Sequence, residues 1–193
     1  GTDRSVELGV RFTSDVAGQI TAIRFYKSAA NTGTHTVALW SSTGSLLGSA
    51  TASGETSSGW QTVPLTSPVT ITAGTTYTAS YHAPSAHYAS DRNYYSVKYD
   101  KSPLHAPANA GVYVYGASRA YPTSTYQGTN YWVDVVLSTG QTVGDSVAPS
   151  TPTGLAATPV SSSKVTLAWT ASTDNVAVAG YKIFRDGTQI NTS

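Results

Sequence analysis

The chain of 193 residues is longer than a typical single sandwich domain, so its length allows one large or two small domains. Charged residues make up 11% of it and the formal net charge is +1, which provides no charged surface for nucleic acid or an anionic membrane. Cys and Met are absent, which excludes disulfides and thiolate zinc sites. No apolar run approaches the roughly 20 residues of a membrane span, and no signal peptide is present. We expect a mature fragment of a secreted, extracellular protein.

Alternating apolar residues predict short β-strands throughout the first 140 residues. Val6, Leu8, Val10 and Phe12 share one face of the first strand. The same period returns at Ile23 and Phe25, Val37 and Leu39, Val63 and Leu65, Tyr77 to Tyr81, and Val133 to Leu137. Gly- and Ser-rich turns separate these segments, and no helical period is present. The pattern predicts an all-β domain, a jelly-roll-like antiparallel β-sandwich.

Between Tyr81 and Tyr121 the alternation weakens, and His, Tyr, Asp, Arg, Lys and Pro accumulate. A long irregular segment in a compact domain is usually functional or disordered. Six tyrosines make disorder unfavourable here. We expect ordered loops with one or two short strands, including Val112 to Tyr115.

The C-terminal part of the chain is expected to form a separate, partial domain. After the first domain (1–140), a Ser-, Thr-, Pro- and Gly-rich linker (141–152) precedes alternating segments and the hairpin signal Asp186-Gly187. The run 148–155, Trp169 and Ala179-Gly180-Tyr181 resemble a fibronectin type III domain. The resemblance implies an immunoglobulin-like sandwich, of which residues 153–193 would be an incomplete, poorly packed portion.

The sequence contains no local motif for catalysis. Seven carboxylates in the first domain include no recognisable glycosidase pair, and the Gly-x-Ser-x-Gly signature of serine hydrolases is missing. The four histidines match no zinc-binding spacing. We therefore expect a non-enzymatic protein without catalytic residues.

Glu7 and Asp134 are candidate ligands of a structural calcium ion. Both lie among apolar residues, one in the first strand and one in the last, and these strands commonly pair in jelly rolls. A carboxylate in an apolar strand is costly unless it is paired, hydrogen-bonded or metal-bound. The alternatives are that both face solvent or bond to Arg11, Arg24 or the backbone, or that they form a structural ion pair.

The strongest functional signal is aromatic, because 13 Tyr and four Trp outnumber three Phe. Such rings stack on the apolar face of a pyranose while their polar atoms bond sugar hydroxyls. The irregular segment combines rings with polar groups, namely Tyr88, Asp91, Arg92, Tyr94, Tyr95 and Tyr99. For these loop tyrosines, ligand binding and packing are equally favoured. Strand aromatics are expected in the core: Tyr77, Tyr81, Trp132, Trp40 and Trp60.

Residues 5–137 resemble a bacterial domain family known mainly as a domain of unknown function in secreted multimodular proteins. The matching segments include 6–10, 23–27, 31–35, 80–84, 87–88, 104–106 and 130–135. The resemblance implies a jelly-roll-like sandwich beside fibronectin modules and, often, glycan-active catalytic domains. His82 and His87 belong to this pattern, which is explained either by a shared ligand site or by a buried hydrogen-bond network.

We expect a monomeric, non-catalytic carbohydrate-binding module of a secreted bacterial glycan-active enzyme. Its partners would be a polysaccharide or cell-wall glycan and the covalently linked neighbouring domains, with neither nucleic acid nor membrane. The alternative is a structural or adhesive spacer without a sugar ligand. An enzyme is the third possibility and would need convergent polar groups in one deep pocket.

Overall fold

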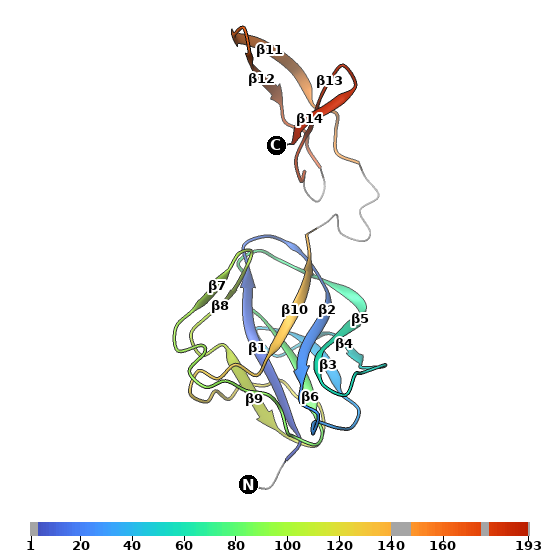
Figure 1. Ribbon diagram of the computed structural model, residues 1–193, viewed down its shortest axis with the longest axis vertical. Helices are drawn as coiled ribbons and strands as arrows, with labels where there is room; N and C mark the ends of the chain where they lie inside the picture. The colour runs from blue at the N-terminus through green and yellow to red at the C-terminus, as the bar shows by residue number, and fades with distance from the viewer. Residues whose placement is uncertain (1–3, 140–147, 175–177, 193) are drawn as a thin grey trace. The chain divides into compact units, whose positions relative to one another are not determined.

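The computed structural model describes residues 4–139, 148–174 and 178–192 (Figure 1). The chain divides into two compact units, Gly1–Thr139 and Gly140–Ser193. Every regular element in the described residues is a β-strand, which confirms the predicted all-β class. Residues 140–147, which include more than half of the predicted linker, lie outside the described residues. Among the described residues, no helix is long and apolar enough to span a membrane.

The first unit is an antiparallel β-sandwich of two sheets (Figure 1). The larger sheet has seven strands in the order β4-β3-β6-β1-β8-β7, with β9 also paired to β1, and the smaller has the order β10-β2-β5. The strand bounds are β1 Val6–Ser14, β2 Gly18–Lys27, β3 Thr36–Ser41, β4 Leu46–Thr51, β5 Gly59–Ile71, β6 Tyr77–Ala83, β7 Tyr99–Lys101, β8 Leu104–Ala106, β9 Gly111–Tyr115 and β10 Val133–Ser138.

The core lies between the inner faces of the two sheets. Leu8 of β1 and Ile23 of β2 are fully buried, as their alternation predicts. Phe25 and Tyr81 stack across the interface with ring centroids 4.4 Å apart. Each large side chain buried in this way contributes about 1.5–3 kcal/mol. Tyr77 also belongs to this core, as expected, whereas Trp40 is buried outside it and bonds to Ser80 on the outer face of the large sheet.

The first and last strands of the sandwich do not pair. Strand β10 pairs with β2 in the smaller sheet. Strand β1 lies inside the larger sheet, where it pairs with β6 along one side and with β8 and β9 along the other. Glu7 and Asp134 therefore belong to different sheets. The prediction that pairing of these strands brings the two carboxylates together is wrong.

The sequence pattern did not predict three of the strands. Strand β4 alternates poorly because most of it is exposed or half-buried, and its sequence LLGSAT contains only two large apolar residues. Strands β7 and β8 have three residues each, which is too short for a period to be visible. They form a hairpin beside the end of β1, within the segment predicted to hold ordered loops and short strands.

The second unit consists of two antiparallel hairpins in its described residues. Strands β11 (Thr153–Ser161) and β12 (Lys164–Thr170) form one, and β13 (Lys182–Arg185) and β14 (Thr188–Thr192) form the other. Asp186 and Gly187 occupy the second turn with positive φ values of 50° and 81°, as the Asp-Gly signal predicts. Leu155 is 71% exposed and Phe184 57% exposed, so the two hairpins bury few of their large apolar side chains.

Candidate functional site

The outer face of the small sheet carries a row of aromatic side chains. Val63 and Val133 face the core, so the strand alternation turns Trp60 of β5 and Trp132, just before β10, toward the outside. Tyr26 of β2 lies between them: it pairs in register with Trp60, and its backbone N–H donates to the Trp132 carbonyl at 3.0 Å. The row therefore crosses all three strands.

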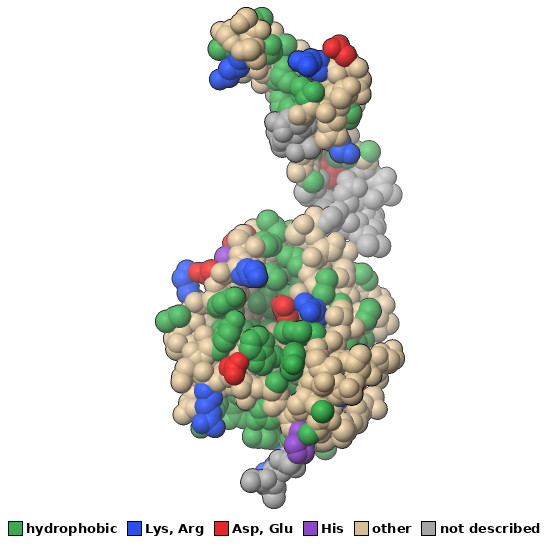
Figure 2. All heavy atoms as spheres, viewed as in Figure 1, with side chains coloured by type: hydrophobic (Ala, Val, Ile, Leu, Met, Phe, Trp, Pro, Cys, Tyr) green, Lys and Arg blue, Asp and Glu red, His purple; other side chains and the backbone are tan. Residues whose placement is uncertain are grey.

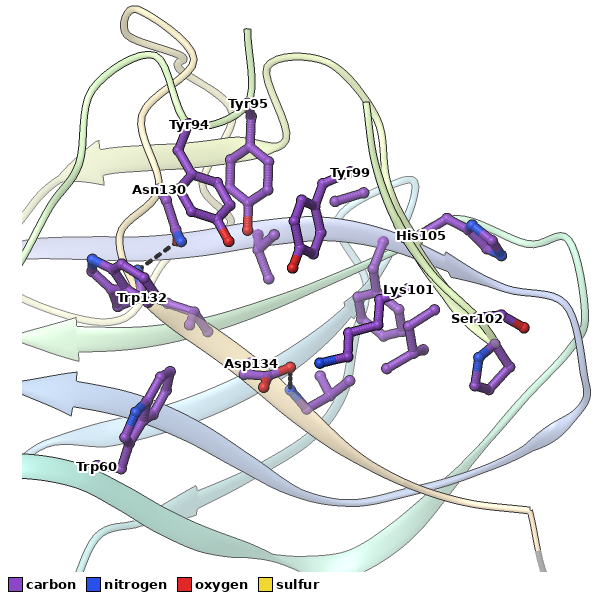
Figure 3. A pocket seen from close by; sticks show the side chains of 17 residues that line it. Trp60, Tyr94, Tyr95, Tyr99, Lys101, Ser102, His105, Asn130, Trp132 and Asp134 are labelled. Carbon is purple, nitrogen blue, oxygen red and sulfur yellow. Dashed lines mark hydrogen bonds between the residues drawn. The ribbon is translucent and has the colours of Figure 1, made fainter. Parts of the chain in front are cut away.

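Tyr94 of a loop and Tyr99 of β7 extend this row into a groove of about 420 Å³ at the β10 edge of the sandwich (Figure 3). Ring centroids lie 6.2 Å apart for Trp60 and Trp132, 5.6 Å for Trp132 and Tyr94, and 5.4 Å for Tyr94 and Tyr99. Trp60 is 38% exposed and Tyr99 44% exposed. We call the site formed by Trp60, Tyr94, Tyr99 and Trp132 the aromatic groove.

Trp132 holds its position through an unusual backbone conformation. Its φ of 54° lies in the left-handed region, which a bulky side chain rarely adopts. The Asn130 side-chain oxygen accepts its backbone N–H at 2.8 Å and fixes the turn. Such strain costs on the order of 1–3 kcal/mol and is concentrated at functional sites. Here it leaves an indole half-buried at the groove.

Polar groups lie beside the rings. Lys101 and Asp134 point toward one another across the groove (Figure 3). The Arg24 guanidinium lies over the Trp60 ring, 4.7 Å from its centroid. On this face of the first unit, hydrophobic side chains surround a hollow that also contains acidic and basic side chains (Figure 2). The groove can therefore offer stacking surfaces and hydrogen-bonding groups to the same ligand.

Two of the groove's phenols are held in the protonated form. Tyr95 lies beneath the rings with 6% of its surface exposed, and burial raises its pKa. Burial also raises the pKa of Tyr94, with a further contribution from the neighbouring Tyr99. At neutral pH both phenols remain neutral and can donate hydrogen bonds.

The β7–β8 hairpin forms one wall of the groove and is fastened by His105. The His105 ring contacts Asp15 through Nε2 at 2.7 Å and Asp100 through Nδ1 at 2.9 Å. Hydrogen bonds to Asp15 and then to Asp100 raise the pKa of His105. Because Asp15 follows β1 and Asp100 lies in β7, the imidazole joins the hairpin to the sandwich.

The residues predicted to bind a ligand do not form one site. Tyr94, Tyr95 and Tyr99 line the aromatic groove, whereas Tyr88 and Arg92 line a different pocket. Asp91 is exposed, and its backbone forms a bridge to Asn130.

The two predicted histidines also lie apart from the groove. His82 is buried on the outer face of the large sheet, and its Nδ1 lies 3.4 Å from Glu7 Oε2. His87 is exposed, with its Nδ1 2.6 Å from the Ser85 carbonyl oxygen.

The predicted metal ligands also lie apart. Glu7 is fully buried and accepts a 2.5 Å hydrogen bond from Ser80, while Asp134 is exposed and accepts the backbone N–H of Val135 at 2.8 Å. Among the described residues, no group of three or more His, Asp or Glu side chains is arranged to hold a metal ion. Calcium binding remains a prediction, but not one between these two carboxylates.

Sequence reasoning assigned Trp60 and Trp132 to the core, and the structure corrects this. The alternation of inward and outward residues along β5 and β10 could have placed them correctly. Val63 and Leu65 face inward on β5, and Val133 and Val135 face inward on β10. Odd-numbered residues therefore face the core at both places, and the even-numbered Trp60 and Trp132 are expected to face outward. Tyr26 follows the same rule beside Phe25.

Comparison with protein families places the chain in a family described as "Domain of unknown function (DUF4082)", whose model matches residues 1–133. The chain belongs to this family, and the match covers almost the whole sandwich and the four aromatic residues that define the groove.

Among characterised proteins, the chain is similar to short parts of long polysaccharide-degrading enzymes. It is 50% identical over 58 residues to chitinase A1 of Niallia circulans, covering 30% of the chain and 8% of the enzyme. It is 53% identical over 51 residues to exoglucanase A of Cellulomonas fimi, covering 26% and 6%. It is 39% identical over 71 residues to an alpha-amylase of Niallia circulans, covering 37% and 6%. The chain thus spans less than a tenth of each relative, and no solved structure matches it.

Proposed function

We propose that the first unit is a non-catalytic carbohydrate-binding module and that the aromatic groove is its binding site. The observation that supports this most directly is the row of exposed or half-exposed rings formed by Trp60, Trp132, Tyr94 and Tyr99. Exposing such side chains to water has an energetic cost, and they would have been more stable in the core. A ligand that covers them recovers this energy.

A neutral polysaccharide fits the chemistry of the groove. The axial C–H groups of a pyranose form an apolar face that packs against an indole or phenol ring, while its hydroxyls form hydrogen bonds at the edges. Lys101, Asp134 and Asn130 provide donors and acceptors beside the rings. Few charges and several rings favour an uncharged sugar chain over a charged peptide.

The relatives suggest the setting in which such a module acts. A chitinase, an exoglucanase and an alpha-amylase all carry a segment similar to part of this chain. We propose that the parent protein is a secreted, multimodular, glycan-active enzyme of a bacterium. Binding to an insoluble polymer would raise the effective concentration of a linked catalytic domain at its substrate. The second unit, with its resemblance to fibronectin type III domains, would connect the module to its neighbours.

A sedimentation assay with insoluble polymers tests this proposal. The 193-residue chain is mixed with cellulose, chitin and insoluble starch, and the free protein is measured after centrifugation. We expect retention on at least one polymer, and we expect Trp132→Ala to weaken it on the order of tenfold or more, because a central ring is removed.

The matched control is Trp169→Ala, which removes another half-buried tryptophan, located in the second unit. Retention should be unchanged in this variant. Melting curves of both variants show whether the first unit stays folded. If no polymer retains the wild-type chain, the spacer function replaces the binding function. If Trp169→Ala abolishes retention and Trp132→Ala does not, the binding site lies in the second unit.

A further inference from the structure

A second pocket in the first unit is lined almost entirely by tyrosine. Five tyrosines and one arginine surround a space of about 300 Å³, and we call them the tyrosine pocket: Tyr88, Arg92, Tyr113, Tyr115, Tyr126 and Tyr131. Tyr131 is 4% exposed and forms the floor, while Tyr115 and Tyr126 are 54% and 47% exposed and form the rim. The pocket is therefore open to solvent and deep enough to enclose part of a ligand.

Arg92 supplies the only charge among the six lining residues. Its guanidinium lies over the Tyr126 ring, 5.6 Å from the centroid, and this cation–π contact holds the charge at the pocket. Within the described part of the chain, Arg92 forms no ion pair with a carboxylate. The pocket thus contains a cation whose hydrogen-bond donors are available.

The phenols around this cation are suited to donate hydrogen bonds. Burial, followed by the effect of the nearby Tyr115, raises the pKa of Tyr88. Burial and then the neighbouring Tyr88 raise the pKa of Tyr131. Neutral phenols beside a guanidinium form a site rich in donors, which attracts an acceptor with negative charge.

The number and shape of these donors indicate which anion fits. A guanidinium presents two parallel N–H groups that match a planar carboxylate. One positive charge balances one carboxylate, whereas a phosphate dianion would need a second cation that the lining residues do not provide. The tyrosine rings add stacking surface for a pyranose. A sugar that carries a carboxylate would use both features.

We infer that the tyrosine pocket is a second binding site, specific for a carboxylate-bearing sugar unit of an acidic polysaccharide. Arg92 would bind the carboxylate, and the rim rings of Tyr115 and Tyr126 would pack on the sugar. This inference extends the proposed function to acidic glycans but does not require that the aromatic groove binds a ligand.

The pocket and the groove are separate sites on neighbouring stretches of the same loops. Tyr131 lines the pocket and the next residue, Trp132, lines the groove. Similarly, Arg92 lines the pocket and Tyr94 the groove. Because no residue lines both sites, a substitution in one can leave the other intact.

Titration calorimetry with the full chain and two matched ligands tests the inference. The ligands are the trimer of galacturonic acid and its methyl ester, which keeps the rings but removes the charges. We expect the acid to bind at least tenfold more tightly than the ester, because the ester cannot form the charge-assisted pair with Arg92. Arg92→Gln should abolish that preference, and Arg92→Lys should restore only part of it, since a lysine retains the charge but not the planar fork.

Trp132→Ala is the matched control, because it alters the groove and should leave binding of the acid unchanged. Arg92 is exposed, so its replacement should not unfold the protein, and a melting curve checks this. Equal binding of the acid and the ester, no binding of either, or an Arg92→Gln variant with undiminished preference would each overturn the inference. Retention on neutral polymers in the sedimentation assay is measured separately, so the two proposals can fail independently.

Discussion

The outward-facing side chains of the two sheets differ in how far they are exposed to solvent. On the large sheet, the outward side chains of Glu7 and Ser80 are polar and buried. On the small sheet, the outward side chains include the exposed rings of Tyr26 and Trp60. The difference separates side chains that maintain the fold from those available to a ligand.

The hidden face contains a chain of polar contacts. Trp40 Nε1 donates to Ser80 Oγ at 2.8 Å, and this hydroxyl donates to Glu7 Oε1 at 2.5 Å. Glu7 is fully buried although it lies on the side of β1 opposite to Leu8. The segment after β9 contacts this face: the Tyr121 ring lies 5.8 Å from that of Trp40.

On the accessible face, nothing in the described residues covers the tryptophans completely. Trp60 is 38% exposed, and its partners are other rings and the Arg24 guanidinium. Contacts of this kind contribute about 0.5–1 kcal/mol each. Substitutions on the hidden face should therefore reduce stability strongly, and those on the accessible face should mainly reduce binding.

The largest effect is expected for Glu7→Ala. The substitution removes the acceptor of the buried Ser80 hydroxyl, which keeps only the Trp40 indole N–H as a partner, and it removes the carboxyl group 3.4 Å from His82 Nδ1. Because breaking a buried polar pair costs about 3–5 kcal/mol, we expect the free energy of unfolding of the first unit to fall by about 3 kcal/mol or more. Urea denaturation followed by tryptophan fluorescence measures this. Glu7→Gln preserves the volume and one acceptor and should cost less; a loss below about 1 kcal/mol for Glu7→Ala would contradict a structural role.

Ser80→Ala should have the next largest effect. The Trp40 indole N–H and the Glu7 carboxylate both lose their hydrogen-bond partner, at a cost of about 1–3 kcal/mol. Trp40→Phe removes the same indole N–H from the other side. If the contact is real, the double variant should be less destabilised than the sum of the two single variants, and strict additivity would argue against it.

How much of this contrast the sequence could predict depends on the residue. Alternation placed Leu8, Ile23 and Phe25 in the core correctly, because burial of every second residue produces that pattern. Alternation alone does not show whether an outward residue is covered by a loop. Glu7 pairs in register with Val114 of β9, more than 100 positions away, and no local signal reports such a long-range neighbour.

The candidate site could also be predicted only in part, because local sequence patterns do not report contacts between distant segments. The loop tyrosines were recognised by their density, and Tyr94 and Tyr99 do lie together in the groove. The tryptophans were assigned to the core because large rings are usually buried, although their parity pointed outward. Tyr88 and Tyr94 lie in different sites because of the loop conformation, which the alternation of apolar residues does not predict.

Trp60→Ala should have a smaller effect on stability than either change on the hidden face. It removes an exposed ring and its contact with Arg24, so we expect a loss of about 1 kcal/mol. If the groove binds a polysaccharide as proposed, retention on that polymer should fall tenfold or more in the same variant. Parallel denaturation and sedimentation of Trp60→Ala and Glu7→Ala would show whether binding and stability separate. A variant of Trp60 that unfolds as readily as Glu7→Ala would show that the two faces do not differ.

The smallest expected effect is a pH dependence of the His105 contact, which joins the groove wall to the sandwich. The two carboxylates raise the pKa of His105 above the usual histidine value of 6.5, so the contact stabilises the fold fully below pH 6.5 and weakens as pH rises through the folded-state pKa. Burial lowers the pKa of His35, so its contribution has the opposite sign and falls as pH drops toward 6, but it is the same in the wild type and in a His105 variant and cancels when the two are compared. The melting temperature at about pH 6, relative to that at about pH 8.5, should therefore be higher in the wild type than in His105→Gln. Added salt should reduce the difference, because Asp15 and Asp100 are exposed, and an equal slope in both proteins would show that another group is responsible.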